Sequence, residues 1–197
     1  MTYDQRSEEQ MTDWLFATQA LKVAPSGHPF WYTSGLLGPY YINTHFLCGG
    51  ETAAAGLLSD IELALEHPRD GLPDLVLAIE AQLDQSEIYQ QVVARLTEAA
   101  RTCSFNLISG GERRDLFFSL PVALRLGQPH LTILKDGTAW YQEDPHQPAE
   151  PAKLISPAGT AALHIADLVT EASSYLRAWL PAIRQLDLSM ADPLAVV

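Results

Sequence analysis

The residues best suited to chemistry follow a short apolar run near the carboxyl end of the chain. Residues 162–165 have the length and composition of a buried parallel strand, and an acid, Asp167, follows them. Small and hydroxylated residues come next, before a helical apolar pattern over residues 175–183. In such a loop, backbone N–H groups can hold a phosphate while the acid reaches sugar hydroxyls. The same residue types also fit an ordinary turn in which Ser173 or Ser174 only caps the helix.

A second candidate loop spans residues 109–115, SGGERRD. Gly110 and Gly111 would let the backbone approach a ligand closely. The paired guanidinium groups of Arg113 and Arg114 can fork onto diphosphate oxygens. The alternative is that both arginines only pair with acids in the same loop or elsewhere on the surface.

Two stretches resemble one enzyme family. Residues 166–174, ADLVTEASS, look like the ribose-5-phosphate loop of type I phosphoribosyltransferases, in which two acids and two apolar residues precede Thr-Thr-Gly-Gly-Ser. Residues 30–43, FWYTSGLLGPYYIN, are similar to the amino-terminal hairpin of orotate phosphoribosyltransferases. Because both occur in the family's order, the chain is identified as an orotate phosphoribosyltransferase-like protein from about Met11 onward.

The resemblance implies an α/β fold with a mostly parallel central sheet flanked by helices, preceded by an amino-terminal helix and a β-hairpin hood. It implies a single domain over residues 1–197, with the helix and hood in residues 1–50 and the core in residues 51–197. The implied reaction is displacement of diphosphate from phosphoribosyl pyrophosphate (PRPP) by a pyrimidine base such as orotate, with Mg²⁺ bound to the substrate. The implied partners are PRPP, a nucleobase and a second copy in a homodimer.

The resemblance also assigns roles to residues. Asp167 would bind the ribose or a metal-bound water, which makes it the nearest candidate for a metal contact, and Lys135 would act on the diphosphate. The 5-phosphate loop would consist of Thr170, Glu171, Ala172, Ser173 and Ser174. The diphosphate loop would consist of Gly110, Gly111, Arg113 and Arg114. The hood would cover the base with Tyr32, Ser34, Tyr40 and Tyr41.

Three positions depart from the family pattern. Leu37 stands where the hairpin usually has a lysine, Ala166 replaces the first of the two acids, and Glu171 brings a carboxylate toward the 5-phosphate. These changes leave two alternatives open. One is a transferase that acts on another base. The other is a catalytically degenerate, regulatory protein that binds a nucleotide, a phosphosugar or a partner protein.

Net charge, cysteine spacing and the lengths of apolar runs argue against nucleic-acid-binding, cysteine-metal and membrane-spanning proteins. A net charge of −12 without a basic stripe argues against a nucleic-acid or anionic-membrane surface. Cys48 and Cys103 have no metal-ligand spacing and suggest reduced thiols in a cytoplasmic protein. No apolar run approaches the roughly twenty residues of a membrane span, and no leader pattern is visible. His164, within an apolar strand, is expected to be a core residue and not a ligand.

The hydrophobic pattern predicts the elements that position these residues. Helices are expected at residues 11–21, 53–65, 84–101 and 116–126, after a frayed segment at 1–9. Strands are expected at residues 75–79, 104–108, 130–134 and 162–165, with two hairpin strands within 30–47. Residues 138–152, rich in prolines and acids, are expected to form a surface loop or short hairpin and not a catalytic lid. Residues 192–197 are expected to begin a further core strand.

Overall fold

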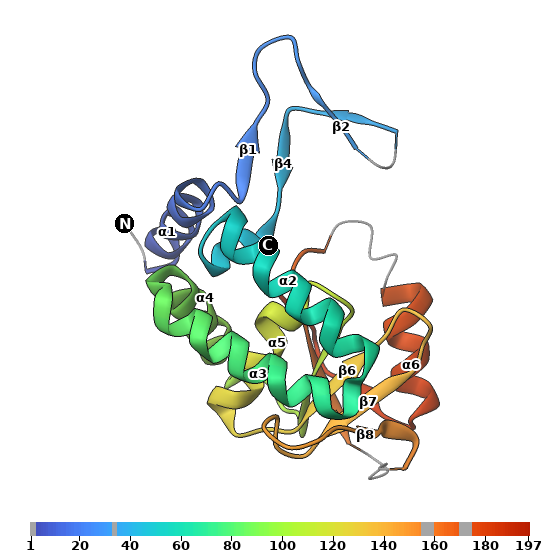
Figure 1. Cartoon of the computed structure of the whole chain (residues 1–197). Coiled ribbons are helices and arrows are strands. Elements are labelled where there is room, and N and C mark those ends of the chain that lie inside the picture. Colours follow the sequence, from blue (N-terminus) through green and yellow to red (C-terminus); the bar gives the residue numbers. More distant parts are fainter. Residues whose placement is uncertain (1–2, 33–34, 155–159, 170–174) are drawn as a thin grey trace.

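The computed structural model describes residues 3–32, 35–154, 160–169 and 175–197, and a mixed sheet lies at its centre (Figure 1). The strands are β5 (Leu107–Gly111), β6 (His130–Ile133), β7 (Ala139–Gln142), β8 (Glu150–Pro151), β9 (Ala161–Ala166), β10 (Ser189–Met190) and β11 (Leu194–Ala195). Their order is β10-β9-β5-β6-β7-β8, and β11 also pairs with β9. The pairs that β5 and β9 make are parallel, while β7 and β8 form an antiparallel edge. The expected mostly parallel sheet is confirmed.

Helices cover both faces of the sheet because its central strands are apolar on both sides. On one side, α5 (Leu116–Leu126) packs with α2 (Glu51–Glu66), α3 (Pro68–Gln85) and α4 (Glu87–Ala100) in one core cluster. On the other side lie a π-helical turn, Tyr175–Trp179, and α6 (Leu180–Gln185). Neighbouring strand residues divide between these sides, so that Ile108 packs toward α5 and Leu107 toward α6.

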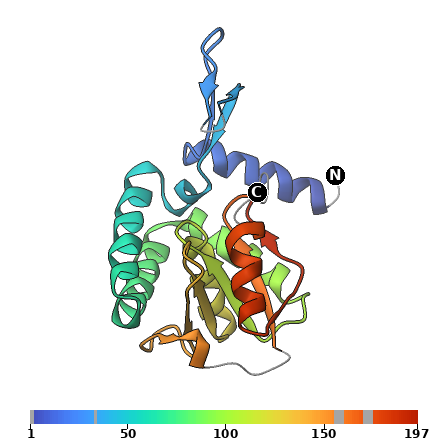
Figure 2. The ribbon, with the colours of Figure 1, turned by 90° about the vertical axis from the view of Figure 1, so that its right-hand side faces the viewer.

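An arm, residues 21–42, projects from this body (Figures 1 and 2). After α1 (Tyr3–Ala17), β1 (Leu21–Val23) pairs antiparallel with β4 (Tyr40–Ile42), and β2 (Phe30–Trp31) pairs antiparallel with β3 (Leu37–Gly38). A 3-10 helix, Thr44–Cys48, leads from the arm into α2. The expected hood is therefore two short ribbons in succession.

Three sequence expectations are wrong in detail. Residues 75–79 lie in the middle of α3, where Leu75, Val76 and Ile79 are buried; a short apolar run does not distinguish a buried strand from a buried helix. Residues 3–9 are helical in place of the expected frayed end, because α1 begins at Tyr3. Residues 44–47, expected as strand, belong to the 3-10 helix.

Most other elements are confirmed within a few residues. The expected helix at 116–126 has those bounds in α5, and the expected strands at 130–134 and 162–165 are β6 and β9. Residues 138–152 form the β7–β8 hairpin, and β11 lies within residues 192–197. Among the described residues, no helix is long and apolar enough to cross a membrane.

Candidate functional site

Two acids meet where β5 and β9 end. These strands are parallel neighbours, so the loops that follow them lie at the same edge of the sheet. Asp115, at the start of α5, accepts the N–H of Gly111 through Oδ2 and the N–H of Asp167 through Oδ1, both at 3.0 Å. The buried Asp115 carboxylate therefore ties the two strand ends together. The sequence analysis missed this role and gave Asp115 only as a member of the second loop.

Asp115 also contacts His164 of β9. Nε2 of His164 lies 3.3 Å from Oδ2 of Asp115, and Nδ1 lies 3.0 Å from Oγ of Ser109. A carboxylate only accepts, so Nε2 of His164 donates to Asp115, while Nδ1 faces the Ser109 hydroxyl. Ser109 and His164 have no exposed surface, so this serine, histidine and aspartate array packs the core and cannot attack a substrate. The expectation that His164 is a core residue is confirmed.

Asp167 is held from the arm side as well. Thr44, in the 3-10 helix that joins the arm to α2, donates its hydroxyl to Oδ2 of Asp167 at 3.0 Å. Burial and the neighbouring Asp115 carboxylate raise the pKa of Asp167 to about 6, against the opposing effects of the Thr44 hydrogen bond and the Arg114 charge. This carboxyl can therefore take up or release a proton near neutral pH.

The cations expected at the diphosphate differ in their surroundings. Arg113 forms an ion pair with Glu62 of α2, a surface acid of the kind that the alternative named, and its role at the diphosphate stays a prediction. Nζ of Lys135 lies 3.9 Å from Glu112, and the Lys135 N–H donates to the same carboxylate at 3.0 Å. Arg114 is exposed, and its charge lowers the pKa of Asp167. Arg114 is the expected cation that the structure places beside the acid pair.

Gly110 and Gly111 are not in the loop, contrary to the prediction, but are the last two residues of β5. A Cβ at Gly110 would lie 2.0 Å from Oγ of Ser119, and a Cβ at Gly111 would lie 2.2 Å from the ring of Trp179. Glycine is required because α5 and the Tyr175–Trp179 turn approach the strand from its two faces. Protein side chains thus fill the space that the prediction left for a ligand.

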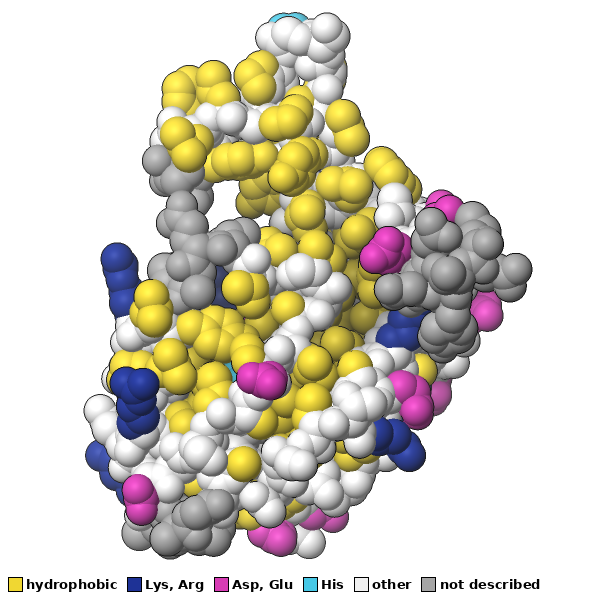
Figure 3. All heavy atoms as spheres, turned by 180° about the vertical axis from the view of Figure 1, so that it is seen from behind, with side chains coloured by type: hydrophobic (Ala, Val, Ile, Leu, Met, Phe, Trp, Pro, Cys, Tyr) yellow, Lys and Arg dark blue, Asp and Glu magenta, His cyan; other side chains and the backbone are white. Residues whose placement is uncertain are grey.

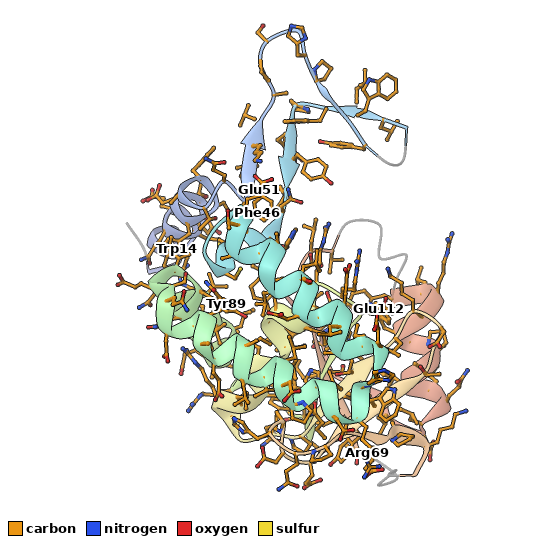
Figure 4. All side chains as sticks on the ribbon, viewed as in Figure 1. Trp14, Phe46, Glu51, Arg69, Tyr89 and Glu112 are labelled. Atoms are coloured by element: carbon orange, nitrogen blue, oxygen red, sulfur yellow. The ribbon has the colours of Figure 1, made fainter. Side chains whose placement is uncertain are left out.

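The arm gathers aromatic rings on one face. The ring centroids of Phe30 and Tyr32 lie 6.0 and 6.3 Å from that of Tyr41. Lys22, opposite Tyr41 in the β1–β4 register, reaches Glu51 and lies over the Phe46 ring. Figure 4 shows Phe46 and Glu51 at the root of the arm, so Lys22, which shares a face of the β1–β4 ladder with Tyr41, is directed toward the body.

Tyr40 and Leu37 lie on the opposite face of the arm. Tyr40 is adjacent to Tyr41 in β4, and Leu37 is paired with Trp31, the neighbour of Phe30. Successive strand residues point to opposite faces. A base that stacks on Tyr41 therefore cannot also stack on Tyr40, and the assignment of both residues to the base stays a prediction. A lysine in place of Leu37 would likewise point away from the aromatic face.

Two buried polar atoms near the acids have no hydrogen-bond partner among the described residues: Nδ1 of His45 and the hydroxyl of Tyr175. Burial, together with the charge of Arg114, lowers the pKa of His45 to about 4, so its imidazole is neutral at pH 7. Burial and the charges of Asp115 and Asp167 raise the pKa of Tyr175. Both groups are neutral and suited to hydrogen bonds with a ligand. The sequence analysis placed Tyr175 on the buried face of a helix and gave neither Tyr175 nor His45 a role at the site; their signal was a polar group in each apolar segment flanking the acids.

Several predicted residues lie outside the described residues. They are Ser34 of the hood and Thr170, Glu171, Ala172, Ser173 and Ser174 of the 5-phosphate loop. Their assigned roles stay predictions. Within the ranges that the structure describes, no group of three or more His, Cys, Asp or Glu residues could hold a metal ion.

Comparison with known proteins gives a fold. No protein-family model and no curated protein matches this sequence. The structure is similar to UMP synthase of Leishmania donovani, with a TM-score of 0.57 and 13% identity over 94% of this chain and 30% of that chain. It is also similar to orotate phosphoribosyltransferases from Francisella tularensis (TM-score 0.52, 13% identity, 94% of this chain and 69% of that chain) and Aeropyrum pernix (0.50, 15%, 94% and 79%). The chain has the orotate phosphoribosyltransferase-like, type I phosphoribosyltransferase fold.

The comparison confirms the resemblance seen in the sequence motifs and the expected fold class. The chain spans less than a third of the length of the UMP synthase chain. Sequence identities of 13–15% show that this chain shares the fold of these proteins, but they do not show which substrate this chain uses. The candidate site of this chain therefore consists of two parts. They are the carboxyl ends of β5 and β9 and the aromatic face of the arm.

Proposed function

We propose that this chain binds PRPP and transfers its 5-phosphoribosyl group to a pyrimidine base, orotate or a related base, with release of diphosphate. The observation that carries the proposal is the position of Asp167. Its carboxyl lies at the end of β9, bound by Thr44 and beside the Arg114 cation. An acid next to a cation at the carboxyl edge of a parallel sheet suits a ribose that bears a diphosphate.

The proposed steps use few residues. Asp167 binds a ribose hydroxyl, and Arg114 binds the diphosphate and stabilises the charge that develops on it as the base displaces it. Tyr41, with Phe30 and Tyr32 beside it, offers an aromatic surface to the base. The predicted 5-phosphate loop, residues 170–174, would hold the far end of the substrate.

We propose that Mg²⁺ binds to this site together with PRPP. Mg²⁺ in such sites uses one or two carboxylates together with substrate phosphates. Asp115 already accepts two N–H groups, so Asp167 is the carboxylate that fits this role, directly or through a bound water. When bound, the ion would neutralise the diphosphate.

A second candidate function is binding without turnover, in a regulatory protein that has kept the fold. The ion pairs of Arg113 with Glu62 and of Lys135 with Glu112 favour it, because they neutralise two cations expected at the diphosphate. Leu37, Ala166 and the acidic Glu171 favour it too. This candidate shares the PRPP or nucleotide site but lacks the transfer step.

Calorimetric titration with PRPP, with and without Mg²⁺, tests both candidates. Arg114→Gln should weaken metal-dependent PRPP binding at least about tenfold, because a charged hydrogen-bond donor to the diphosphate is lost. The matched control is Arg69→Gln, whose arginine pairs with Glu150 at the end of the molecule away from the arm (Figure 4) and should leave affinity unchanged. No PRPP binding, or equal binding by Arg114→Gln, would contradict the proposed site.

Product analysis separates the two candidates. Formation of a nucleoside monophosphate from PRPP and orotate, or from another pyrimidine, supports the transferase. Metal-dependent binding with no product from any base supports the regulatory protein. We further propose a cytoplasmic homodimer, for which the two free cysteines and the arm give the physical arguments.

A further inference from the structure

Tyr175 holds a hydroxyl that the chain itself does not use. The residue begins the π-helical turn before α6 and is 9% exposed. Its hydroxyl oxygen is buried and has no hydrogen-bond partner among the described residues. Such a hydroxyl disfavours the ligand-free state, because it has lost its hydration and gained nothing in exchange. A partner from outside the chain would remove this cost.

Packing, and not the hydroxyl, fixes the ring of Tyr175. The ring meets that of His164 edge to face, with centroids 5.0 Å apart and an interplanar angle of 73°. Ala166, the last residue of β9, packs in the same apolar cluster as Tyr175 and contributes no polar side-chain atom. The ring therefore covers the end of β9 on the α6 side, and a phenylalanine could keep the same position.

The two acids of the site act on this hydroxyl through their charges. Burial and the charges of Asp115 and Asp167 raise the pKa of Tyr175, so the hydroxyl keeps its proton and can donate it. Asp115 already accepts from two backbone N–H groups and from His164. Asp167 accepts from Thr44 on the arm side. The Tyr175 proton thus lies beside two carboxylates, yet it is bound to neither of them.

The surrounding charges indicate which ligand group suits the hydroxyl. Two neighbouring carboxylates would repel a phosphate oxygen. A sugar hydroxyl is neutral, and it can donate its proton to a carboxylate while its oxygen accepts from another donor. Asp167 is such a carboxylate, and Tyr175 is such a donor. A buried water is the alternative partner for the same hydroxyl.

We infer that the Tyr175 hydroxyl donates a hydrogen bond to the ribose hydroxyl that Asp167 binds, so that Tyr175 selects a ligand with a sugar over diphosphate alone. Tyr175 then contacts the ribose from the α6 side, while Thr44 holds Asp167 from the arm side. The inference rests on the proposed function, because it takes Asp167 as the ribose contact.

Tyr175→Phe tests the inference, because it removes the hydroxyl and keeps the ring. In calorimetric titrations with Mg²⁺ present, its affinity for PRPP should be about three- to tenfold lower than that of the unaltered chain. Its affinity for diphosphate, which has no sugar, should be unchanged. Without ligand, the variant should melt at the same temperature as the unaltered chain or higher, since the lost hydroxyl had no partner.

Tyr141→Phe is the matched control. Tyr141 of β7 is 8% exposed, but its hydroxyl donates to Glu143, and β5 and β6 separate its strand from β9. This variant should bind PRPP as the unaltered chain does and should melt at a lower temperature, because its hydroxyl had a partner. Circular dichroism verifies that both variants are folded.

Equal PRPP affinity of Tyr175→Phe and the unaltered chain would overturn the inference and leave a buried water as the partner of the hydroxyl. An equal loss of affinity for PRPP and for diphosphate would overturn it too, because the effect would not come from the sugar. So would a ligand-free Tyr175→Phe that melts as low as the control. An unaltered chain that does not bind PRPP would contradict the proposed function, and the inference with it.

Discussion

The edge of the sheet and the arm differ in which kind of side chain they bury and which kind they expose. At the ends of β5 and β9, polar groups are buried and tied to one another through Asp115. On the arm, large apolar side chains such as Val23, Trp31 and Leu37 are exposed, and residues 23–50 contain no Asp, Glu, Lys or Arg. Figure 3 shows apolar side chains gathered over the arm. The first region is completed within the chain and offers few free groups to a ligand. The second leaves large apolar side chains exposed to solvent in the single chain.

This difference indicates where substitutions will be costly. A buried carboxylate with three partners is sensitive to the loss of its charge or geometry. A solvent-exposed ribbon tolerates change in the isolated chain, and its substitutions should alter association more than folding. The predictions below test that contrast, beginning with the largest expected effect.

Asp115→Asn should lower the free energy of unfolding by about 2–4 kcal/mol. The asparagine carbonyl can accept one of the two N–H groups, while its amide N–H₂ would face the other. Urea denaturation measures the change. Asp192→Asn, at an exposed acid, is the control and should stay within about 0.5 kcal/mol of the unaltered chain. An equally small change for Asp115→Asn would show that the Asp115 hydrogen bonds contribute little to stability.

Asp167→Asn should stabilise the protein at pH 8 by about 1–2 kcal/mol while abolishing ribose-dependent binding. The pKa of Asp167 is raised to about 6 in the folded protein from the ordinary 3.8, so the folded state holds this proton more tightly than the unfolded state. The contribution of this group to stability is therefore greatest below about pH 4 and falls as pH rises to about 6.

Urea denaturation of Asp167→Asn at pH 4, 6 and 8 measures this effect. The stabilisation relative to the unaltered chain should vanish at about pH 4, close to the ordinary pKa of an aspartate. It should reach its full size by about pH 8, above the folded-state pKa of about 6. A variant with the same pH dependence as the unaltered chain would mean that Asp167 ionises normally. Unchanged PRPP affinity would remove Asp167 from the proposed site.

Lys22→Gln should have the smallest effect, below about 0.5 kcal/mol. The Lys22 ammonium lies 3.1 Å from Glu51 and 5.5 Å from the centroid of the Phe46 ring, but both members of the ion pair are partly exposed. Thermal melting in low and high salt measures it. A loss above about 2 kcal/mol would show that the arm is coupled to the core more tightly than its exposure indicates.

Much of the fold could be predicted from local pattern. The motif at residues 30–43 and the strand, loop and helix around Asp167 were sufficient for the fold family, and α5 was predicted with its observed bounds. The two main failures, at residues 75–79 and at Gly110 and Gly111, have one cause: each depends on packing against residues that are distant in the chain. The apolar run at residues 75–79 is short, and only its packing within α3 reveals a helix. Similarly, the two glycines of β5 were taken for loop residues because nothing in the sequence shows that Ser119 and Trp179 pack against them.

The candidate site was predicted in part. Asp167 and Arg114 lie near one another, as the motifs indicated, whereas the partner of Arg113 is Glu62, which is 51 positions earlier in the chain and carries no local signal. The division of Tyr40 and Tyr41 between two faces follows from the strand alternation once β4 has been placed.

The sequence by itself determined α5, the strands β6 and β9, the absence of charged residues at 23–50 and the presence of an acid after an apolar strand, because each depends on residues close together in the chain. Only the tertiary structure decided which groups are used by the protein itself. Asp115 receives hydrogen bonds from the ends of two strands, and its contact with Asp167 spans 52 positions. Such contacts depend on the register of β5 against β9, and that register is set by packing on both faces of the sheet.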